Sequence, residues 1–537
     1  MPLKLFAGTL PWLQNWRVYI GRAPAELPPR SLIIFPLREN ILPCGLAGIL
    51  AIKKDRRESS SPHPAAALDT GLRTVMQNGM AALLAGSIDP AGYLGGQDPL
   101  AILERLTLTM KEEDPFLELL VSPEQTGRVA ALALQINAFA VAEEKLLEDN
   151  ALRFTTAEIE IINSRQMILK DIAWALEKDI LENTRRVQVL ATGANDVPAA
   201  PAALKKYVQL NYLLNSLDRL EVRGRDSAGI QISMSFKDPG VWGDAFAGIR
   251  EAGLAEDFHA RIRSGDFVNG SIHLSRRGSA AAVTAEEASA REGSGAVSSP
   301  SKGGSQDTDC ISLSFVYKTA STIGELGRNV RELRETISRD RLLRLLAGLE
   351  TEFVVSLAHT RWASVGSITV ENCHPINNFT RGEASGAAPA GTGAEKYFPA
   401  YGRGYWSISV ALNGDIDNYR QLRHTLEAGG ELIAPEVTTD TKIIPLEIER
   451  HLREGSDAAE AFRRAVNAFE GSHAIAMITD LEPGKVFLAL RGSGQSIYIG
   501  IAGDRYLFSS ELYRLVEGTP YFLKMDGETP AAAGGEA

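Results

Sequence analysis

The sequence predicts a mixed α and β fold (α+β) in which strand-forming segments are separated by a long helical block. Apolar, β-branched runs typical of strands occur at 46–52, 230–236, 353–358 and 407–412. Between the first two runs, residues 53–222 show the repeating apolar pattern of amphipathic helices. With 537 residues the chain can bury more than one core, so two or more domains are expected.

The composition narrows the class of partner. Hydrophobic residues make up 44% of the chain and charged residues 23%, which is ordinary for a globular protein. The formal net charge of -11 argues against nucleic acid or an anionic membrane as the main partner. We therefore expect a small-molecule ligand, with no nucleic-acid and no membrane partner.

Cysteine use and hydropathy indicate the compartment. Three cysteines, Cys44, Cys310 and Cys373, are too few for a disulfide framework and fit a reducing environment. The first residues lack the sustained apolar core of a signal peptide, and no later stretch reads as a membrane span. A cytoplasmic location is expected.

The block from residue 53 to 205 is predicted to be a bundle of amphipathic helices. Its clearest segment begins with the capping-box residues Thr155 and Glu158 and continues with apolar residues four apart. These are Ile168, Ile172, Leu176 and Ile180. Such stripes are much more often helix core than cofactor site, and no set of ligating residues accompanies them, so no cofactor is expected here.

The stretch 357–375, LAHTRWASVGSITVENCHP, is the centre of the candidate site. A buried strand breaks there into polar residues that include Arg361 and Trp362. A guanidinium binds a carboxylate through two parallel hydrogen bonds, and a neighbouring indole shields that ion pair from water. From these residues alone, a surface arginine beside a packed tryptophan remains the alternative.

Five strings in order resemble the class II glutamine amidotransferases, and specifically the glutaminase domain of glucosamine-6-phosphate synthase (glutamine-fructose-6-phosphate aminotransferase). They are CGLAGILAI at 44–52, RGRDSAG at 223–229, HTRWA at 359–363 with NCHP at 372–375, LNGDIDNY at 412–419 and TTDT at 438–441. The resemblance implies the four-layer α/β/β/α sandwich of N-terminal-nucleophile hydrolases, with the helical bundle as an insertion.

The resemblance also implies the organisation of the chain. The expected parts are an N-terminal extension or propeptide (1–43), the glutamine amidotransferase domain (44–52 and 206–525), the inserted helical domain (53–205), a disordered loop (276–309) and a tail (526–537).

Site roles follow from the same resemblance, one position at a time. Cys44 matches the nucleophile, and the Asn413 amide with the Gly414 N–H matches the oxyanion hole. Arg361 matches the group that binds the glutamine α-carboxylate, and Asp440 the one that binds its α-ammonium. The remaining candidates are Trp362 on the loop that closes over glutamine, Arg223 and Gly224 beside the nucleophile, and His374 of the NCHP string as a substrate contact.

An N-terminal nucleophile needs neither a histidine base nor a metal. The free α-amine of the nucleophile, with an ordinary pKa near 8, accepts the thiol proton. Cys44 is internal in this sequence, so catalysis requires removal of the residues before it. The competing Cys373–His374 pair is disfavoured because adjacent residues on an extended chain point to opposite faces, and Cys373 is expected to be a buried core residue.

The expected activity is hydrolysis of glutamine to glutamate and ammonia, for transfer to fructose 6-phosphate on isomerase domains that are separate or missing. The expected partner is such a sugar-isomerase domain or a second copy of the chain. The alternative is a non-catalytic glutamine-binding or scaffold module in which the residues before Cys44 are never removed. A glutaminase for a purine or glutamate pathway is a third reading, which HTRWA and RGRDSAG disfavour.

Overall fold

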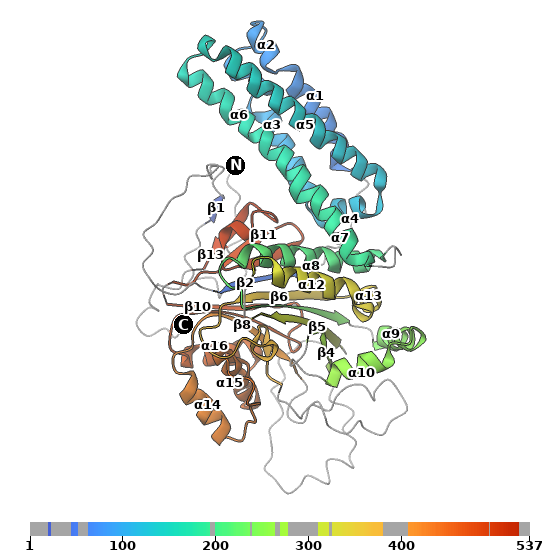
Figure 1. Ribbon diagram of the computed structural model, residues 1–537, viewed down its shortest axis with the longest axis vertical. Helices are drawn as coiled ribbons and strands as arrows, with labels where there is room; N and C mark the ends of the chain where they lie inside the picture. The colour runs from blue at the N-terminus through green and yellow to red at the C-terminus, as the bar shows by residue number, and fades with distance from the viewer. Residues whose placement is uncertain are drawn as a thin grey trace. The chain divides into compact units, whose positions relative to one another are not determined.

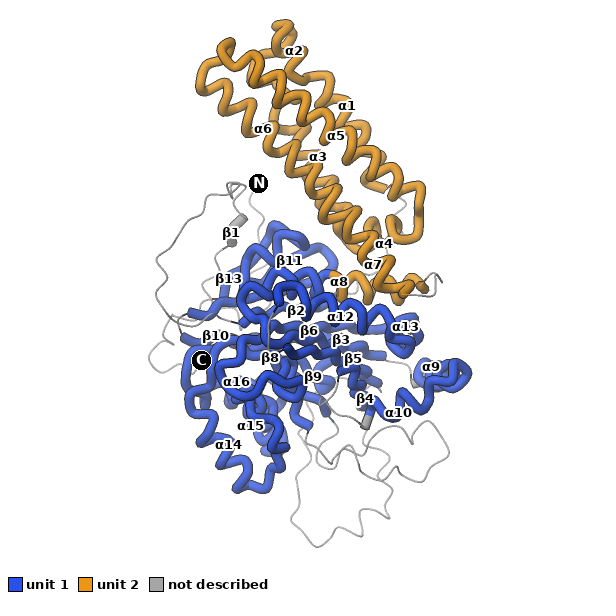
Figure 2. The backbone as a smooth tube through the Cα atoms, viewed as in Figure 1, with its two compact units in different colours: residues 1–52, 212–537 blue, residues 53–211 orange. Residues whose placement is uncertain are grey.

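The computed structural model describes residues 20–22, 44–51, 63–193, 199–236, 239–263, 269–277, 310–321, 325–379, 406–492 and 494–525. The chain divides into two compact units, residues 1–52 with 212–537 and residues 53–211 (Figure 2). Most of the expected extension 1–43, the expected loop 276–309 beyond residue 277, and the tail 526–537 lie outside the described residues.

The first unit contains two antiparallel sheets. The nine-stranded sheet has the order β1-β13-β11-β12-β2-β6-β3-β5-β4. Its strands are β1 (Ile20–Arg22), β2 (Gly45–Ala51), β3 (Ser227–Phe236), β4 (Ser271–Arg277), β5 (Cys310–Ala320), β6 (Phe353–Arg361), β11 (Tyr498–Ile501), β12 (Arg505–Ser509) and β13 (Tyr521–Lys524). The four-stranded sheet has the order β10-β9-β8-β7 and consists of β7 (Ile376–Asn377), β8 (Ile408–Gly414), β9 (His473–Thr479) and β10 (Phe487–Arg491).

Side-chain alternation along the strands packs the two sheets face to face. Val355 and Leu357 of β6 point to the same face and share a buried cluster with Ala411 of β8 and Ala476 of β9. The other face of β8 carries Leu412 and its neighbours into a second cluster with the helices below. Because both faces of these strands are buried, their sequences are continuous apolar runs and do not alternate between apolar and polar residues.

Helices cover the outer face of each sheet (Figure 1). On the nine-stranded side they are α9 (Pro239–Glu251), α10 (Ala255–Arg263), α12 (Arg328–Arg339), α13 (Arg341–Ala347) and the end of α8 (Pro201–Leu220). On the four-stranded side they are α14 (Tyr419–Ala428), α15 (Ile443–Arg453) and α16 (Ala458–Ala468). The predicted four-layer α/β/β/α arrangement is therefore confirmed for this unit.

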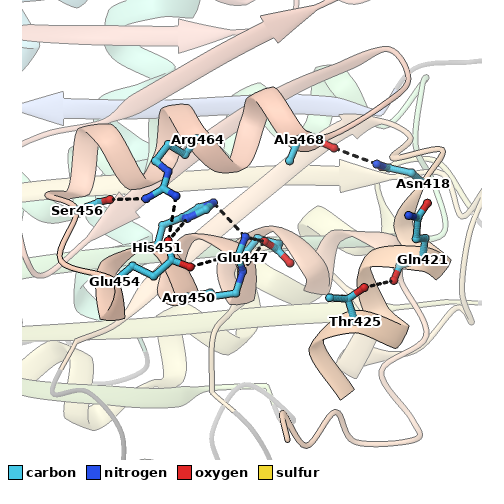
Figure 3. Close-up of polar contacts among 10 residues, drawn as sticks. All are labelled: Asn418, Gln421, Thr425, Glu447, Arg450, His451, Glu454, Ser456, Arg464 and Ala468. Atoms are coloured by element: carbon cyan, nitrogen blue, oxygen red, sulfur yellow. Dashed lines mark hydrogen bonds and ion pairs between the residues drawn. The ribbon is translucent and has the colours of Figure 1, made fainter. Parts of the chain in front are cut away.

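Charged residues tie α15 to α16 across their outer surface (Figure 3). Arg450 pairs with Glu447 at 2.7 Å and with Glu454 at 2.6 Å. Glu454 also pairs with Arg464 of α16 at 3.0 Å. At the other end of the layer the Asn418 Nδ2 donates to the backbone oxygen of Ala468 at 2.9 Å. The short 3-10 helix η8 (Asp440–Lys442), which carries the candidate Asp440, directly precedes α15.

The second unit is a helical bundle. It consists of α1 (Pro64–Gln77), α2 (Met80–Leu84), η2 (Pro90–Gly95), α3 (Gln97–Thr109), α4 (Glu113–Val121), α5 (Pro123–Asn150), η3 (Ala151–Arg153), α6 (Thr156–Trp174), η4 (Ala175–Glu182), α7 (Asn183–Thr192) and the first turns of α8. The capping box forms at the start of α6, where the Thr155 N–H donates to Glu158 at 2.7 Å. Ile172, Leu176 and Ile180 lie in the core as their spacing predicts, and Ile168 packs against it.

Within the part of the chain that is described, no helix is long and apolar enough to cross a membrane.

Candidate functional site

Strand pairing brings most of the predicted residues to one end of the nine-stranded sheet. Gly45 of β2 lies opposite Thr360 of β6, and Ser227 of β3 lies opposite Arg361. Cys44, Arg361 and the turn before β3 therefore meet, although they come from distant parts of the sequence. Short loops at a strand end are a common place for functional side chains.

Cys44 is half-buried at the first residue before β2. Its Sγ accepts a hydrogen bond from the Trp362 N–H at 3.2 Å and lies 3.5 Å from the Trp362 carbonyl oxygen. Burial raises the pKa of Cys44 to about 11, and the contact with Trp362 and the charge of Arg361 oppose that rise. The thiol is thus protonated at neutral pH, and it needs a base before it can attack.

Arg361 is almost completely buried beside Cys44. Its guanidinium donates to the Ser367 carbonyl at 3.0 Å and to the Val365 carbonyl, so it braces the loop that starts at Trp362. Burial lowers the pKa of Arg361, while Cys373, Cys44 and Asp440 oppose the shift. The Trp362 side chain is 43% exposed, which leaves it accessible from solvent.

Two carboxylates face this cation and the thiol. Asp440 is buried, and its Oδ2 accepts from the Ile416 N–H at 3.0 Å. The pKa of Asp440 is raised to about 6, mainly by burial; the Ile416 N–H opposes the rise and the charge of Asp415 adds to it. Asp415 accepts a hydrogen bond from the Ser364 Oγ at 2.5 Å. Asp415 was not among the predicted residues; only its place directly after the Asn-Gly pair marked it.

The end of β8 presents an unused hydrogen-bond donor. Asn413 is fully buried, and its Oδ1 lies 3.0 Å from the His359 Nε2. The Asn413 Nδ2 has no hydrogen-bond partner among the described residues. Gly414 follows with φ of +89°, and a Cβ there would come within 2.1 Å of the Ser472 carbonyl oxygen. The chain turns sharply here only because residue 414 is glycine.

Arg223 and Gly224 form the turn that precedes β3. The Arg223 Nη1 pairs with the Glu511 Oε1 at 2.6 Å. A Cβ on Gly224 would come within 2.8 Å of the Arg361 backbone carbon, so the glycine lets this turn lie directly on the end of β6. The pair therefore adjoins the strand end that carries Arg361.

His374 and Cys373 lie in the core. The His374 Nδ1 accepts from the Leu412 N–H at 3.4 Å, and its Nε2 lies 2.8 Å from the Thr441 Oγ1. Cys373 is fully buried, and its Sγ contacts the His374 backbone oxygen at 3.4 Å, not the imidazole. Both ring nitrogens of His374 are thus occupied by the protein.

No group of three or more His, Cys, Asp or Glu side chains that could hold a metal ion occurs among the residues described above.

Comparison with known proteins identifies the relatives. Residues 401–517 match a family model described as a glutamine amidotransferase domain. The chain is 29% identical over 172 residues to the glutamine–fructose-6-phosphate aminotransferase (isomerizing) of Methanothermobacter thermautotrophicus, covering 32% of this chain and 24% of that protein. It is 31% identical over 175 residues to the enzyme of the same name from Sulfolobus acidocaldarius, covering 32% and 25%.

The chain thus spans about a quarter of the length of these curated relatives. Among solved structures, one titled as the allosteric regulatory enzyme of purine biosynthesis aligns with 15% identity and a TM-score of 0.28, covering 56% of this chain and 45% of that chain.

Proposed function

Because this chain carries a class II glutamine amidotransferase domain, we propose that it hydrolyses glutamine to glutamate and ammonia, with Cys44 as the nucleophile. The observation that carries the proposal is the meeting of Cys44, Arg361 and Asp440 at one sheet end. The Asn413 Nδ2, a buried donor without a partner, supports it.

The charges of the site complement a free amino acid. Glutamine carries an α-carboxylate and an α-ammonium group. Arg361 supplies the cation for the first, and Asp440 with Asp415 supplies the negative charge for the second. Recognition of both charged groups positions the side-chain carboxamide, which is where bond breaking takes place.

In the proposed reaction the Cys44 thiol attacks the carboxamide carbon while its own free α-amine accepts the thiol proton. The carbonyl oxygen becomes an oxyanion that accepts hydrogen bonds from the Asn413 Nδ2 and the Gly414 N–H. The protonated amine returns its proton to the leaving nitrogen, and ammonia departs from a thioester. Water then hydrolyses the thioester to glutamate and restores the thiol.

This mechanism requires cleavage of the peptide bond between Pro43 and Cys44. Until that bond is broken, the Cys44 nitrogen is a peptide amide and cannot accept a proton. The raised pKa of Cys44 makes the base indispensable, since burial of the sulfur disfavours the thiolate. The decisive experiment is the intact mass and N-terminal sequence of the protein from its own cells, together with ammonia release from glutamine.

A chain that begins at Cys44 and releases ammonia supports the proposal, provided that Cys44→Ala abolishes the release. A chain that begins at Cys44 and is silent toward glutamine overturns it. An uncleaved chain that binds glutamine without hydrolysing it establishes the alternative, a glutamine-binding or scaffold module, because Arg361 and Asp440 need no free N-terminus.

We further propose that the ammonia is transferred to fructose 6-phosphate on a sugar-isomerase domain of another polypeptide or of the same assembly. The support is the name of the curated relatives, since the chain covers only about a quarter of each. The test is formation of glucosamine 6-phosphate from glutamine and fructose 6-phosphate by the protein with its co-purified partners. Transfer to a different acceptor, such as a purine precursor, would contradict this assignment and leave the glutaminase proposal intact.

A further inference from the structure

A polar side-chain contact between the two sheets lies at the candidate site. Along β6, Val355, Leu357 and His359 share the face turned toward the four-stranded sheet, and along β8 Ala411 and Asn413 share the face turned back. The same alternation places the His359 and Asn413 side chains between the two sheets, where both are fully buried. There the His359 Nε2 lies 3.0 Å from the Asn413 Oδ1.

This contact decides which way the Asn413 amide points. A carboxamide has an oxygen on one side and an NH2 group on the other. With its Oδ1 against His359, the Nδ2 is directed away from the imidazole, and it has no partner among the described residues. In the reverse orientation of the Asn413 carboxamide, the NH2 group would face the His359 ring and could not donate to a ligand. A buried donor that is left unpaired is unfavourable and is explained where a ligand supplies the acceptor.

We propose that His359 is a positioning residue whose Nε2–H holds the Asn413 Oδ1 and thereby aims the Asn413 Nδ2 at the oxyanion of glutamine hydrolysis. The inference rests on the proposed function and adds a residue that has no assigned role in it. In this proposal His359 acts on the reaction only through Asn413.

The protonation of the ring agrees with this role. His359 is completely buried, and burial is the main reason that its pKa falls to about 3; Arg361 acts in the same direction, while Asn413 and the Leu412 backbone oppose the shift. A neutral ring carries one N–H. A proton on Nδ1 would bury that N–H without a partner, because no described residue bonds to the His359 Nδ1. In that tautomer the unprotonated Nε2 would also direct its lone pair at the Asn413 Oδ1, which is an acceptor too. The Nε2–H tautomer avoids both costs.

The second buried histidine supports the first. The His359 and His374 rings lie 4.3 Å apart between centroids, with a 40° angle between their planes. His374 takes the Leu412 N–H on its Nδ1 and therefore directs an Nε2–H to the Thr441 Oγ1. Its ring is held at both nitrogens, and this fixed ring packs against His359 and limits the rotation that would release Asn413.

The test is a double-mutant cycle on the full chain, with a protease site placed before Cys44 so that its amine is released. Asn413→Ala should lower kcat about 100- to 1000-fold, the loss typical of one oxyanion donor. His359→Leu should lower kcat about tenfold or more with little change in KM, because the contact acts on the transition state. The double variant should match Asn413→Ala alone. If the loss of kcat in the double variant equals the product of the two single losses, the two residues act independently, and the inference is overturned.

Two controls separate positioning from general damage. His359→Gln places an amide N–H near the original Nε2 and should recover part of the kcat lost in His359→Leu. Equal losses in the two variants would mean that the donor is irrelevant. Thermal unfolding of each variant shows whether the fold is kept, and kcat is compared only among folded variants.

A measurement that needs no activity completes the test. The 15N spectrum of the uncleaved chain, with the His359 signals assigned through His359→Gln, should show a protonated Nε2 and a bare Nδ1 from about pH 5 to about pH 8. A proton on Nδ1 would overturn the inference even in an active enzyme. If the tautomer is as expected but the chain that starts at Cys44 releases no ammonia, the proposed function fails, and the catalytic role of the contact fails with it.

Discussion

The backbone N–H of Trp362 donates to the Sγ of Cys44 at 3.2 Å. Trp362 is the first residue of the loop whose Ser367 carbonyl accepts a hydrogen bond from Arg361, so the start of this loop contacts the sulfur. Opening of that loop would remove a hydrogen bond from the sulfur and free the guanidinium from two backbone carbonyls. The hydrogen bonding of the thiol and that of the guanidinium therefore depend on the same loop.

Cys44→Ala should abolish ammonia release from glutamine and leave the fold intact, because the side chain is small and half-buried. The measurement is ammonia release together with the thermal unfolding midpoint. Cys310→Ala, which changes another half-buried cysteine on β5, is the matched control and should keep full activity. Activity retained in Cys44→Ala would show that Cys44 is not the nucleophile.

Alkylation of Cys44 in the uncleaved chain should be slow at neutral pH and rise about tenfold per pH unit over the accessible range, because burial raises the thiol pKa to about 11. Arg361→Met should slow it further, since the charge of Arg361 lowers that pKa. The rate is followed by mass spectrometry with iodoacetamide. A plateau reached by about pH 9 would contradict the burial argument.

Arg361→Ala should raise the glutamine concentration needed for half-maximal rate by about ten- to a hundredfold, the loss expected for a charge-assisted pair with a carboxylate. Arg361→Lys should recover little, since an ammonium cannot make two parallel hydrogen bonds. Arg339→Ala is the control, because that side chain is exposed and pairs only loosely with Glu335 at 3.5 Å. An unchanged KM in Arg361→Ala would place the substrate carboxylate elsewhere.

Asp440→Asn should stabilise the protein at pH 7 while weakening glutamine binding. Burial raises the pKa of Asp440 from 3.8 to about 6, so the folded state binds the proton more tightly than the unfolded chain does. Stability therefore falls as pH rises from about 4 to 6, and the ionised carboxylate costs up to about 3 kcal/mol above that range.

The check on Asp440 is the free energy of unfolding at about pH 4 and pH 7, with glutamine binding measured on the same samples. The gain in Asp440→Asn should appear at the higher pH and shrink at the lower. An equal gain at both values would mean that the charge of Asp440 is not its origin.

Local patterns account for the parts of the fold that the sequence predicted. The apolar runs of β3, β6 and β8 are buried on both faces, which is why they read as continuous apolar segments. The capping box at Thr155 and Glu158 lies within four residues of sequence, and it forms as expected. Such features depend on residues that are close together in the sequence, so they can be predicted from the sequence alone.

The alternation of side chains along β6 and β8 bears on one contact of the site, the one between His359 and Asn413. Counting by twos from Val355 reaches His359 and Arg361, and counting back from Asn413 reaches the buried Ala411. The alternation marks the faces, but the pairing of β6 with the opposite sheet is needed to say that the His359 and Asn413 side chains meet.

By itself, the sequence determined the four-layer class through the strings that resemble a known family, the helical character of the block predicted at 53–205, and the residue types available for chemistry. The tertiary structure decided which of them meet. It set Cys44 against Trp362, 318 residues later in the chain, brought the unpredicted Asp415 to the thiol, and fixed the Asn413 amide through His359. These contacts depend on strand register and sheet packing, which bring distant segments together and which no local pattern of residues encodes.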